Sequence, residues 1–211
     1  MKTYILLVIA LLLTACSNPE QPSIGFYPAL QRGDIEQIER HIKWGTDVNQ
    51  IDKDGSRPLQ VAARLGNYAV VKLLLKNGGA IDALDREGHS ALYAAIMAGK
   101  PRVAEILIRQ GAQLDPDQLL DQAVANDMTD RDVIQLLVRQ GADINHLDAE
   151  GQTPLMHAIK RNNRVLAKHL ITHGADVNQE DSSNKYPLAL AEEFGNEEII
   201  RLLRRNGARH K

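Results

Sequence analysis

The stretch GADINHLDAEGQTPL, residues 141–155, contains two short motifs that return along the chain at a fixed interval. Its first motif is Gly141-Ala142-Asp143-Ile144-Asn145, and similar pieces begin at Gly45, Gly78, Gly111, Gly174 and Gly207. Successive glycines are 33, 33, 30, 33 and 33 residues apart. A constant step of this size indicates a stacked array of small structural units rather than one large globular core.

The second motif, Gly151-Gln152-Thr153-Pro154-Leu155, keeps the same step. Its counterparts are Gly55-Ser56-Arg57-Pro58-Leu59, Gly88-His89-Ser90-Ala91-Leu92 and Asn184-Lys185-Tyr186-Pro187-Leu188. Proline suits the first turn of a helix, where no amide hydrogen is needed. The glycines of the first motif follow apolar runs such as residues 70–75, where a helix end favours a positive φ. Each unit is therefore predicted to read turn, helix, turn, helix.

Together the two motifs resemble ankyrin repeats, whose signature is T-P-L-H-x-A at a 33-residue period. The resemblance covers residues 24–211 and implies an all-α solenoid of about six helix pairs with short β-hairpin fingers. The approximate repeats are 24–49, 50–82, 83–115, 116–145, 146–178 and 179–211. The chain departs from the pattern at the signature histidine, which is replaced by Gln60, Tyr93, Met156 and Ala189.

The fourth repeat is irregular. Asp115-Pro116-Asp117 stands where the other repeats have a finger, and residues 126–130 lengthen the turn between its two helices. The net loss of three residues predicts a notch on the finger side of the array. The terminal helix pairs, around residues 26–44 and 187–205, are expected to cap the solenoid.

The N-terminus has the layout of an export signal: a basic start at Lys2, ten apolar residues from Tyr4 to Leu13, and small residues up to Cys16. Ten helical residues span about 15 Å, half of the roughly 30 Å of a bilayer core, so this segment is too short for a permanent transmembrane helix. Leu13-Thr14-Ala15-Cys16 resembles the lipobox of bacterial lipoproteins, which implies a signal peptide at 1–15 and a lipidated Cys16 followed by a flexible spacer to residue 23. The alternative is an unmodified thiol in a discarded leader.

The lipobox resemblance also implies a location. Ser17 after the cysteine resembles the pattern for transfer to the outer membrane, with the folded part facing the periplasm. Without the leader the chain has 24 Lys and Arg against 27 Asp and Glu, a formal charge of about −3, which disfavours a nucleic-acid partner.

Catalytic patterns are missing from the sequence. It contains no H-E-x-x-H, paired C-x-x-C or P-loop, and His157, His169 and His173 are expected on different helix faces. Gly88-His89-Ser90-Ala91-Leu92 begins like a nucleophile elbow but lacks its second glycine. We therefore predict no enzyme activity, no metal and no cofactor.

The ankyrin resemblance implies a protein partner, bound by the finger tips and the inner face of the first helices, and a chain that is monomeric on its own. Carried over by position, the candidate contacts are Ile51, Lys53, Asp54, Arg64, Leu84, Arg86, Glu87, His89, Met97, Leu147, Lys160, Arg161, Glu193 and Phe194. The function expected is that of a lipid-anchored binding module. Its concrete form is an immunity protein against an antibacterial toxin such as a lipase effector; the alternative is an envelope scaffold or a protective factor for a resident periplasmic protein.

Overall fold

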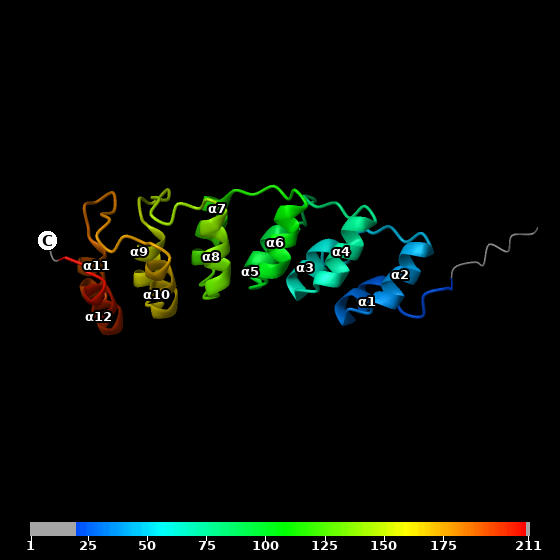
Figure 1. The fold of residues 1–211 in the computed structure, drawn as a ribbon, viewed down its shortest axis with the longest axis horizontal. Coiled ribbons are helices and arrows are strands. Elements are labelled where there is room, and N and C mark those ends of the chain that lie inside the picture. The colour runs from blue at the N-terminus through cyan, green and yellow to red at the C-terminus, as the bar shows by residue number, and fades with distance from the viewer. Residues whose placement is uncertain (1–19, 210–211) are drawn as a thin grey trace, which may run out of the picture.

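The computed structural model describes residues 20–209, which form six helix hairpins stacked in one row (Figure 1). The helices are α1 Phe26–Arg32, α2 Ile35–Lys43, α3 Pro58–Leu65, α4 Tyr68–Lys76, α5 Ala91–Met97, α6 Pro101–Arg109, α7 Pro116–Ala125, α8 Arg131–Arg139, α9 Pro154–Lys160, α10 Arg164–Thr172, α11 Pro187–Glu193 and α12 Glu197–Arg205. The predicted all-α solenoid is confirmed. The signal peptide and Cys16 lie outside the described residues.

The fifth hairpin shows how the sequence sets helix boundaries. Pro154 opens α9, and the hydroxyl of Thr153 before it accepts the amide of Met156. The side chain of Asn163 caps α10 in the same way by accepting the amide of Leu166 at 3.0 Å. Such caps satisfy amides that have no partner inside the helix, and each contributes about 1 kcal/mol.

The core is a continuous layer between the inner helices (α1, α3, α5, α7, α9, α11) and the outer helices (α2, α4, α6, α8, α10, α12). It consists of aliphatic side chains, and Ala62 and Ala95 let neighbouring helices approach closely while Leu74, Leu107 and Leu137 fill the layer, all fully buried. The thin aliphatic core agrees with the low aromatic content of 4%. Every layer buries its apolar face only against its neighbours.

A ladder of Asn and Asp side chains joins successive repeats. Asn49 accepts the amide of Ala80 at 2.7 Å and donates to the carbonyl of Gly78 at 2.9 Å. The repeat brings Asp82, Asn145 and Asn178 to equivalent places, where each accepts an amide of the next repeat at 2.7–2.8 Å. The last residue of the first sequence motif is therefore a repeat-to-repeat clamp.

Each finger is numbered after the repeat whose inner helix follows it: the second finger is 44–57, the third 77–90, the fifth 140–153 and the sixth 173–186, and among residues 20–209 these loops contain no β-strand. The expected β-hairpins are thus corrected to tight turns. In each finger two backbone hydrogen bonds close the turn; in the second finger the Asp52 amide donates to the Ser56 carbonyl at 2.9 Å and the Gly55 amide donates to the Asp52 carbonyl at 3.1 Å. The Asp52 carboxylate also accepts the amides of Asp54 and Ser56. In a strand pair the Ser56 amide would instead donate to the backbone carbonyl of Asp52, so the side chain takes the place of that backbone hydrogen bond.

The fourth repeat has the predicted irregularity. Helix α7 begins at Pro116, directly after the connection 110–115, so no finger stands there, and the α7–α8 loop occupies residues 126–130. Asp115 caps α7 by accepting the amide of Gln118, and the neighbouring Asp117 takes over the clamp by accepting the amide of Asp143 at 2.7 Å. The stack continues, but its finger side is open at this level.

Candidate functional site: the finger face and the α7 groove

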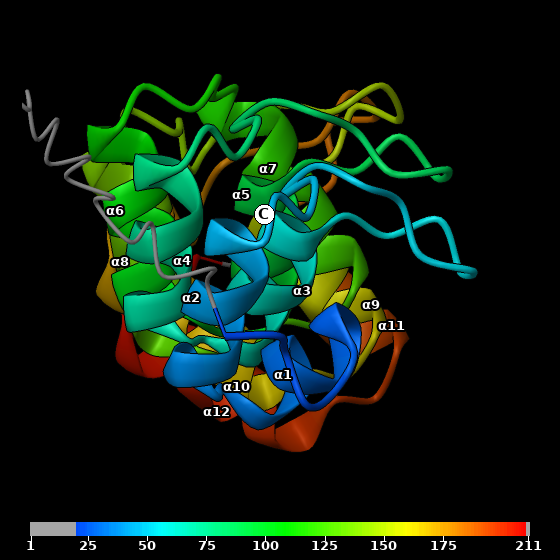
Figure 2. The ribbon, with the colours of Figure 1, turned by 90° about the vertical axis from the view of Figure 1, so that its right-hand side faces the viewer.

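The finger face consists of the four fingers and the adjoining inner helices. Figure 2 shows the finger loops projecting beside the inner helices α3, α5 and α7, on the side away from α4, α6 and α8. Because the fourth repeat has no finger, two hollows flank α7 on this face. Gln122 lines both of them, so they form one surface feature, the α7 groove.

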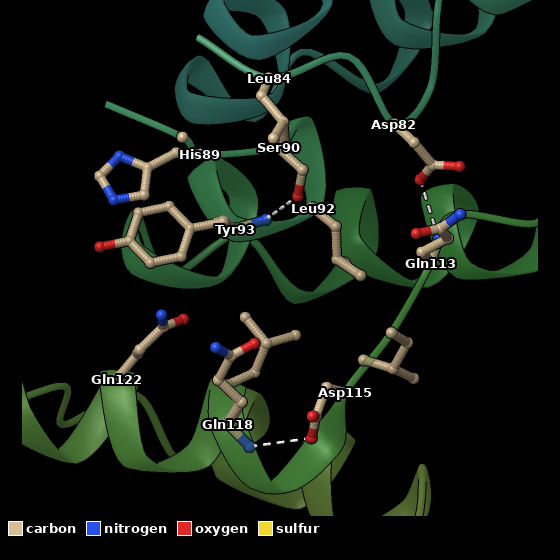
Figure 3. A pocket seen from close by; sticks show the side chains of 13 residues that line it. Asp82, Leu84, His89, Ser90, Leu92, Tyr93, Gln113, Asp115, Gln118 and Gln122 are labelled. Carbon is tan, nitrogen blue, oxygen red and sulfur yellow. Dashed lines mark hydrogen bonds between the residues drawn. The ribbon is translucent and has the colours of Figure 1, made fainter. Parts of the chain in front are cut away.

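The first half of the groove has a volume of about 380 Å³ and lies between the third finger and α7 (Figure 3). Leu84, His89 and Tyr93 line it on one side, and Gln118 and Gln122 face them from α7. The rings of His89 and Tyr93 stack with centroids 3.9 Å apart. This half therefore offers a flat aromatic surface beside two amide groups, which can bind a peptide backbone or polar side chains.

The second half, about 310 Å³, lies between α7 and the fifth finger. Asp121 lines it from α7, and Asp148, His157 and Arg161 line it from the fifth repeat. Burial alone raises the pKa of Asp148, but the amide of Gln152 and the ring of His157 outweigh it, and the pKa is lowered. Asp148 is therefore a carboxylate at neutral pH, held in place by its own finger.

His146 joins the fifth finger to α7. Its Nδ1 lies 2.6 Å from the carbonyl oxygen of Asp143, and its Nε2 lies 2.8 Å from a carboxylate oxygen of Asp121. A carbonyl oxygen faces Nδ1 and a carboxylate lies at ion-pair distance from Nε2, so the arrangement favours the positively charged imidazolium. Burial alone lowers the pKa of His146, but the Asp143 carbonyl and the Asp121 carboxylate outweigh it, and the net pKa is raised.

The apolar members of the predicted binding set lie exposed on the finger face. Ile51, Leu84, Leu147 and Phe194 are 50%, 53%, 43% and 49% exposed, so their apolar side chains are open to a partner. Of the other predicted residues, Lys53, Asp54, Arg64, Glu87 and Lys160 are exposed, and His89 and Met97 are half-buried. Whether they contact a partner stays a prediction.

Three predicted contacts also have roles inside the chain. Arg86 donates to the carbonyl of Lys53 at 3.3 Å, bridging the second and third fingers. Arg161 donates to the carbonyl of Ala125 at 2.6 Å and pairs with Asp127, which fixes the long α7–α8 loop. Glu193 pairs with Lys185 at 2.6 Å. Replacing either arginine would therefore alter the shape of the face as well as its chemistry.

Several groove residues were missed by sequence reasoning. The hollows are lined from α7 by Gln118, Asp121 and Gln122, which no finger of the fourth repeat covers. The shortened repeat was the sequence feature that could have indicated them. Gln60 was also missed as a connector. From the signature-histidine position its side chain accepts the Arg57 amide and donates to the carbonyls of Ala83 and His89, tying α3 to the third finger.

Two clusters within residues 20–209 bring metal-ligand types together: Asp85, Glu87 and His89 in the third finger, and Asp148, Glu150 and His157 in the fifth. In both, one oxygen of the Asp accepts two amides of its own turn. That turn explains the spacing of the acidic residues without an ion. We assign no metal to either cluster.

Comparison with known families decides the class of the protein. Residues 26–118 and 120–211 match the family described as "Ankyrin repeats (3 copies)". The chain is an ankyrin-repeat protein. Among curated proteins, no sequence matches it.

Solved structures share this ankyrin fold. The ankyrin repeat domain of Bcl-3 is 28% identical, with 90% of this chain and 89% of that chain covered and a TM-score of 0.69. A chain in the structure of a predatory endopeptidase from Bdellovibrio bacteriovorus in complex with an immunity protein is 25% identical, with 88% and 99% covered and a TM-score of 0.65. An ankyrin repeat domain from Acinetobacter baumannii is also 25% identical, with 88% and 100% covered and a TM-score of 0.65.

Ankyrin-repeat domains generally act as non-catalytic modules that bind other proteins, and the repeats of this chain indicate a protein-binding module. The open α7 groove fits that role, since a solenoid offers an extended surface rather than a closed pocket. None of the helices described in residues 20–209 has the length and apolar character needed to span a membrane.

Proposed function

We propose that this ankyrin-repeat protein is an immunity protein: it is exported, anchored at Cys16, and binds one toxic enzyme of the cell envelope without turnover. The observation that carries the proposal is the likeness to a chain of an endopeptidase–immunity protein structure, which extends over 88% of this chain and 99% of the other. The enzyme in that structure is a predatory endopeptidase, and we propose a toxic enzyme of that general kind as the partner, in place of the lipase suggested by the sequence.

The α7 groove supplies a place for such a partner. It lies between two fingers; exposed Leu84 lines its first half, and exposed Leu147 directly precedes Asp148, which lines its second half. Binding energy in protein interfaces concentrates in a few aromatic, apolar or Arg groups around a desolvated centre. A protruding loop of the toxin seated in the groove would contact Tyr93 and Gln122 and be flanked by both leucines.

A contact-competition assay tests the proposal even while the toxin is unidentified. The gene is deleted in its native strain, and the deletion strain is mixed with its parent on a surface that forces contact. We expect the deletion strain to lose at least about tenfold in recoverable cells, and the full chain to restore survival. Equal survival of deletion strain and parent would overturn the immunity function.

Two variants locate the activity. Gln118→Arg combined with Gln122→Arg fills the groove with long side chains from α7 and should fold normally but fail to protect. Gln31→Arg combined with Gln140→Arg, at two exposed positions that line neither half of the groove, is the matched control with the same change in net charge and should protect fully. An envelope defect of the deletion strain in pure culture, without any effect of contact, would instead support the scaffold alternative and contradict immunity.

A further inference from the structure

The outer helices and the fingers carry opposite charge. Within their bounds, α2, α4, α6, α8, α10 and α12 contain thirteen Lys and Arg against six Asp and Glu. The four fingers and the connection 110–115 contain thirteen Asp and Glu against four Lys and Arg. Figure 2 shows α4, α6 and α8 on the side away from the finger loops. A chain with a formal net charge of only −2 is therefore strongly polarised.

Many of the outer-helix cations are not neutralised by neighbours. Within residues 20–209, Arg109 and Arg164 pair with Glu105 and Glu198 at 3.3 Å. No carboxylate of the described part lies within ion-pair distance of the exposed Lys43, Lys76, Arg102, Arg131, Arg139, Lys168, Arg201 and Arg205. One or more such cations occur on every outer helix. Their positive field is therefore available to a partner.

Two hollows on this face combine cations with apolar groups. One, of about 440 Å³ between α4 and α6, is lined by Leu73, Leu75 and Ile106 together with Lys72 and Lys76. The other, of about 150 Å³ between α10 and α12, is lined by Arg164, Arg201, Arg205, Leu202 and Glu198. Lysine stems cover apolar surface while the ammonium groups reach anionic headgroups, which is the pattern of a membrane-interface surface.

The N-terminal segment leads to the same face. Glu20 pairs with Arg40 of the outer helix α2 at 2.8 Å, and the amide of Ser23 donates to the Gln37 side chain of that helix at 2.9 Å. Four residue steps separate Glu20 from Cys16, so a lipid on Cys16 lies within about 14 Å of Glu20 even if the chain is fully extended. An anchor at Cys16 would hold α2 near the membrane.

We propose that the outer-helix face lies against a bilayer rich in anionic phospholipid and directs the acidic finger face away from it. The occupant follows from charge complementarity over six helices and from the attachment of the N-terminal segment to α2. The inference rests on the proposed envelope location and adds the orientation of the bound protein. It does not depend on which toxin, or whether a toxin, binds the fingers.

Vesicle binding tests this orientation separately from immunity. Residues 17–211 contain all twelve described helices, and this unlipidated fragment is mixed with vesicles of equal parts phosphatidylglycerol and phosphatidylcholine, or of phosphatidylcholine alone. We expect co-sedimentation with the anionic vesicles, weakening as salt rises from 50 to 300 mM, and none with the neutral ones. No co-sedimentation with anionic vesicles at 50 mM salt would overturn the proposal.

A pair of variants with the same change in net charge locates the contact. Lys76→Glu, Arg139→Glu and Lys168→Glu reverse three exposed cations of the outer helices and should weaken vesicle binding at least about tenfold, since each cation near an anionic surface accounts for about fivefold. Lys53→Glu, Arg64→Glu and Lys160→Glu reverse three exposed cations of the finger and inner-helix side and should bind within about twofold of the parent. Equal weakening by both variants would contradict the orientation, and circular dichroism confirms that both are folded.

Discussion

Replacing Asn145 by alanine removes one clamp of the repeat-to-repeat ladder. Asn145 accepts the amide of Asp176 at 2.7 Å and donates to the carbonyl of Gly174 at 3.4 Å. A net intramolecular hydrogen bond contributes about 0.5–1.5 kcal/mol, and the second bond is long and exposed, so we expect a loss of about 1–2 kcal/mol in the free energy of unfolding. For a domain of this size that corresponds to a fall in Tm of about 2–8 °C.

Asn145→Asp is the matched control, because a carboxylate still accepts the Asp176 amide but cannot donate to Gly174. Asp82 already makes this single bond naturally, to the amide of Gln113 at 2.8 Å. We expect Asn145→Asp to cost about half as much as Asn145→Ala. Urea unfolding gives both values, and hydrogen exchange should show faster opening of α11 and α12 at the weakened end of the stack. Unchanged stability in Asn145→Ala would refute the clamp.

Three other predictions address the core, the groove and the N-terminus. Leu137 is fully buried, so Leu137→Ala should lower the urea-unfolding free energy by about 2–5 kcal/mol, whereas the half-exposed Phe194→Ala should change it by less than about 0.5 kcal/mol. The folded-state pKa of His146 is raised, so the contribution of its charged ring to the free energy of unfolding is complete below the ordinary pKa of 6.5 and is lost as pH rises through the raised pKa. The difference in unfolding free energy between the parent and His146→Gln should therefore shrink as pH rises. A difference that grew with pH would contradict the pairing of His146 with Asp121. In cells fed an alkyne fatty acid, the full chain should be labelled and found with membranes and Cys16→Ala should not; label retained by Cys16→Ala would disprove the anchor.

The fold could be predicted well from the sequence because the residues that begin and end helices recur at the same positions in several repeats. Regular spacing in the sequence predicted three features: the Gly that follows each outer helix, the Pro that begins α3, α9 and α11, and the missing finger before α7. The finger conformation was predicted less well. Whether a turn extends into a strand pair depends on whether its amides donate to backbone carbonyls or to side chains. In the second finger the amides of Asp54 and Ser56 donate to the Asp52 carboxylate.

The α7 groove could be predicted as a gap but not as a set of side chains. Its lining depends on how far α7 rotates and on which turn of the helix the neighbouring fingers reach. Gln118 and Gln122, one turn apart, face Tyr93, while Asp121 faces the fifth repeat and pairs with His146. Spacing along one chain does not give this three-dimensional pairing, because Asp121 and His146 belong to successive repeats whose 30-residue step differs from all the others.

Charge polarity and the missing finger have consequences that reinforce each other. An acidic finger face attracts a basic partner surface and speeds its approach, but electrostatic attraction alone does not choose one partner among many. The α7 groove adds shape: a partner must offer a protrusion that fits between the third and fifth fingers. If the outer helices lie on a membrane, the partner can approach only from the finger side, so long-range attraction, access and shape all favour the same surface. A partner that bound tightly while leaving Leu84, Tyr93 and Leu147 as exposed as they are in the free chain would break this connection and move the interface to another face.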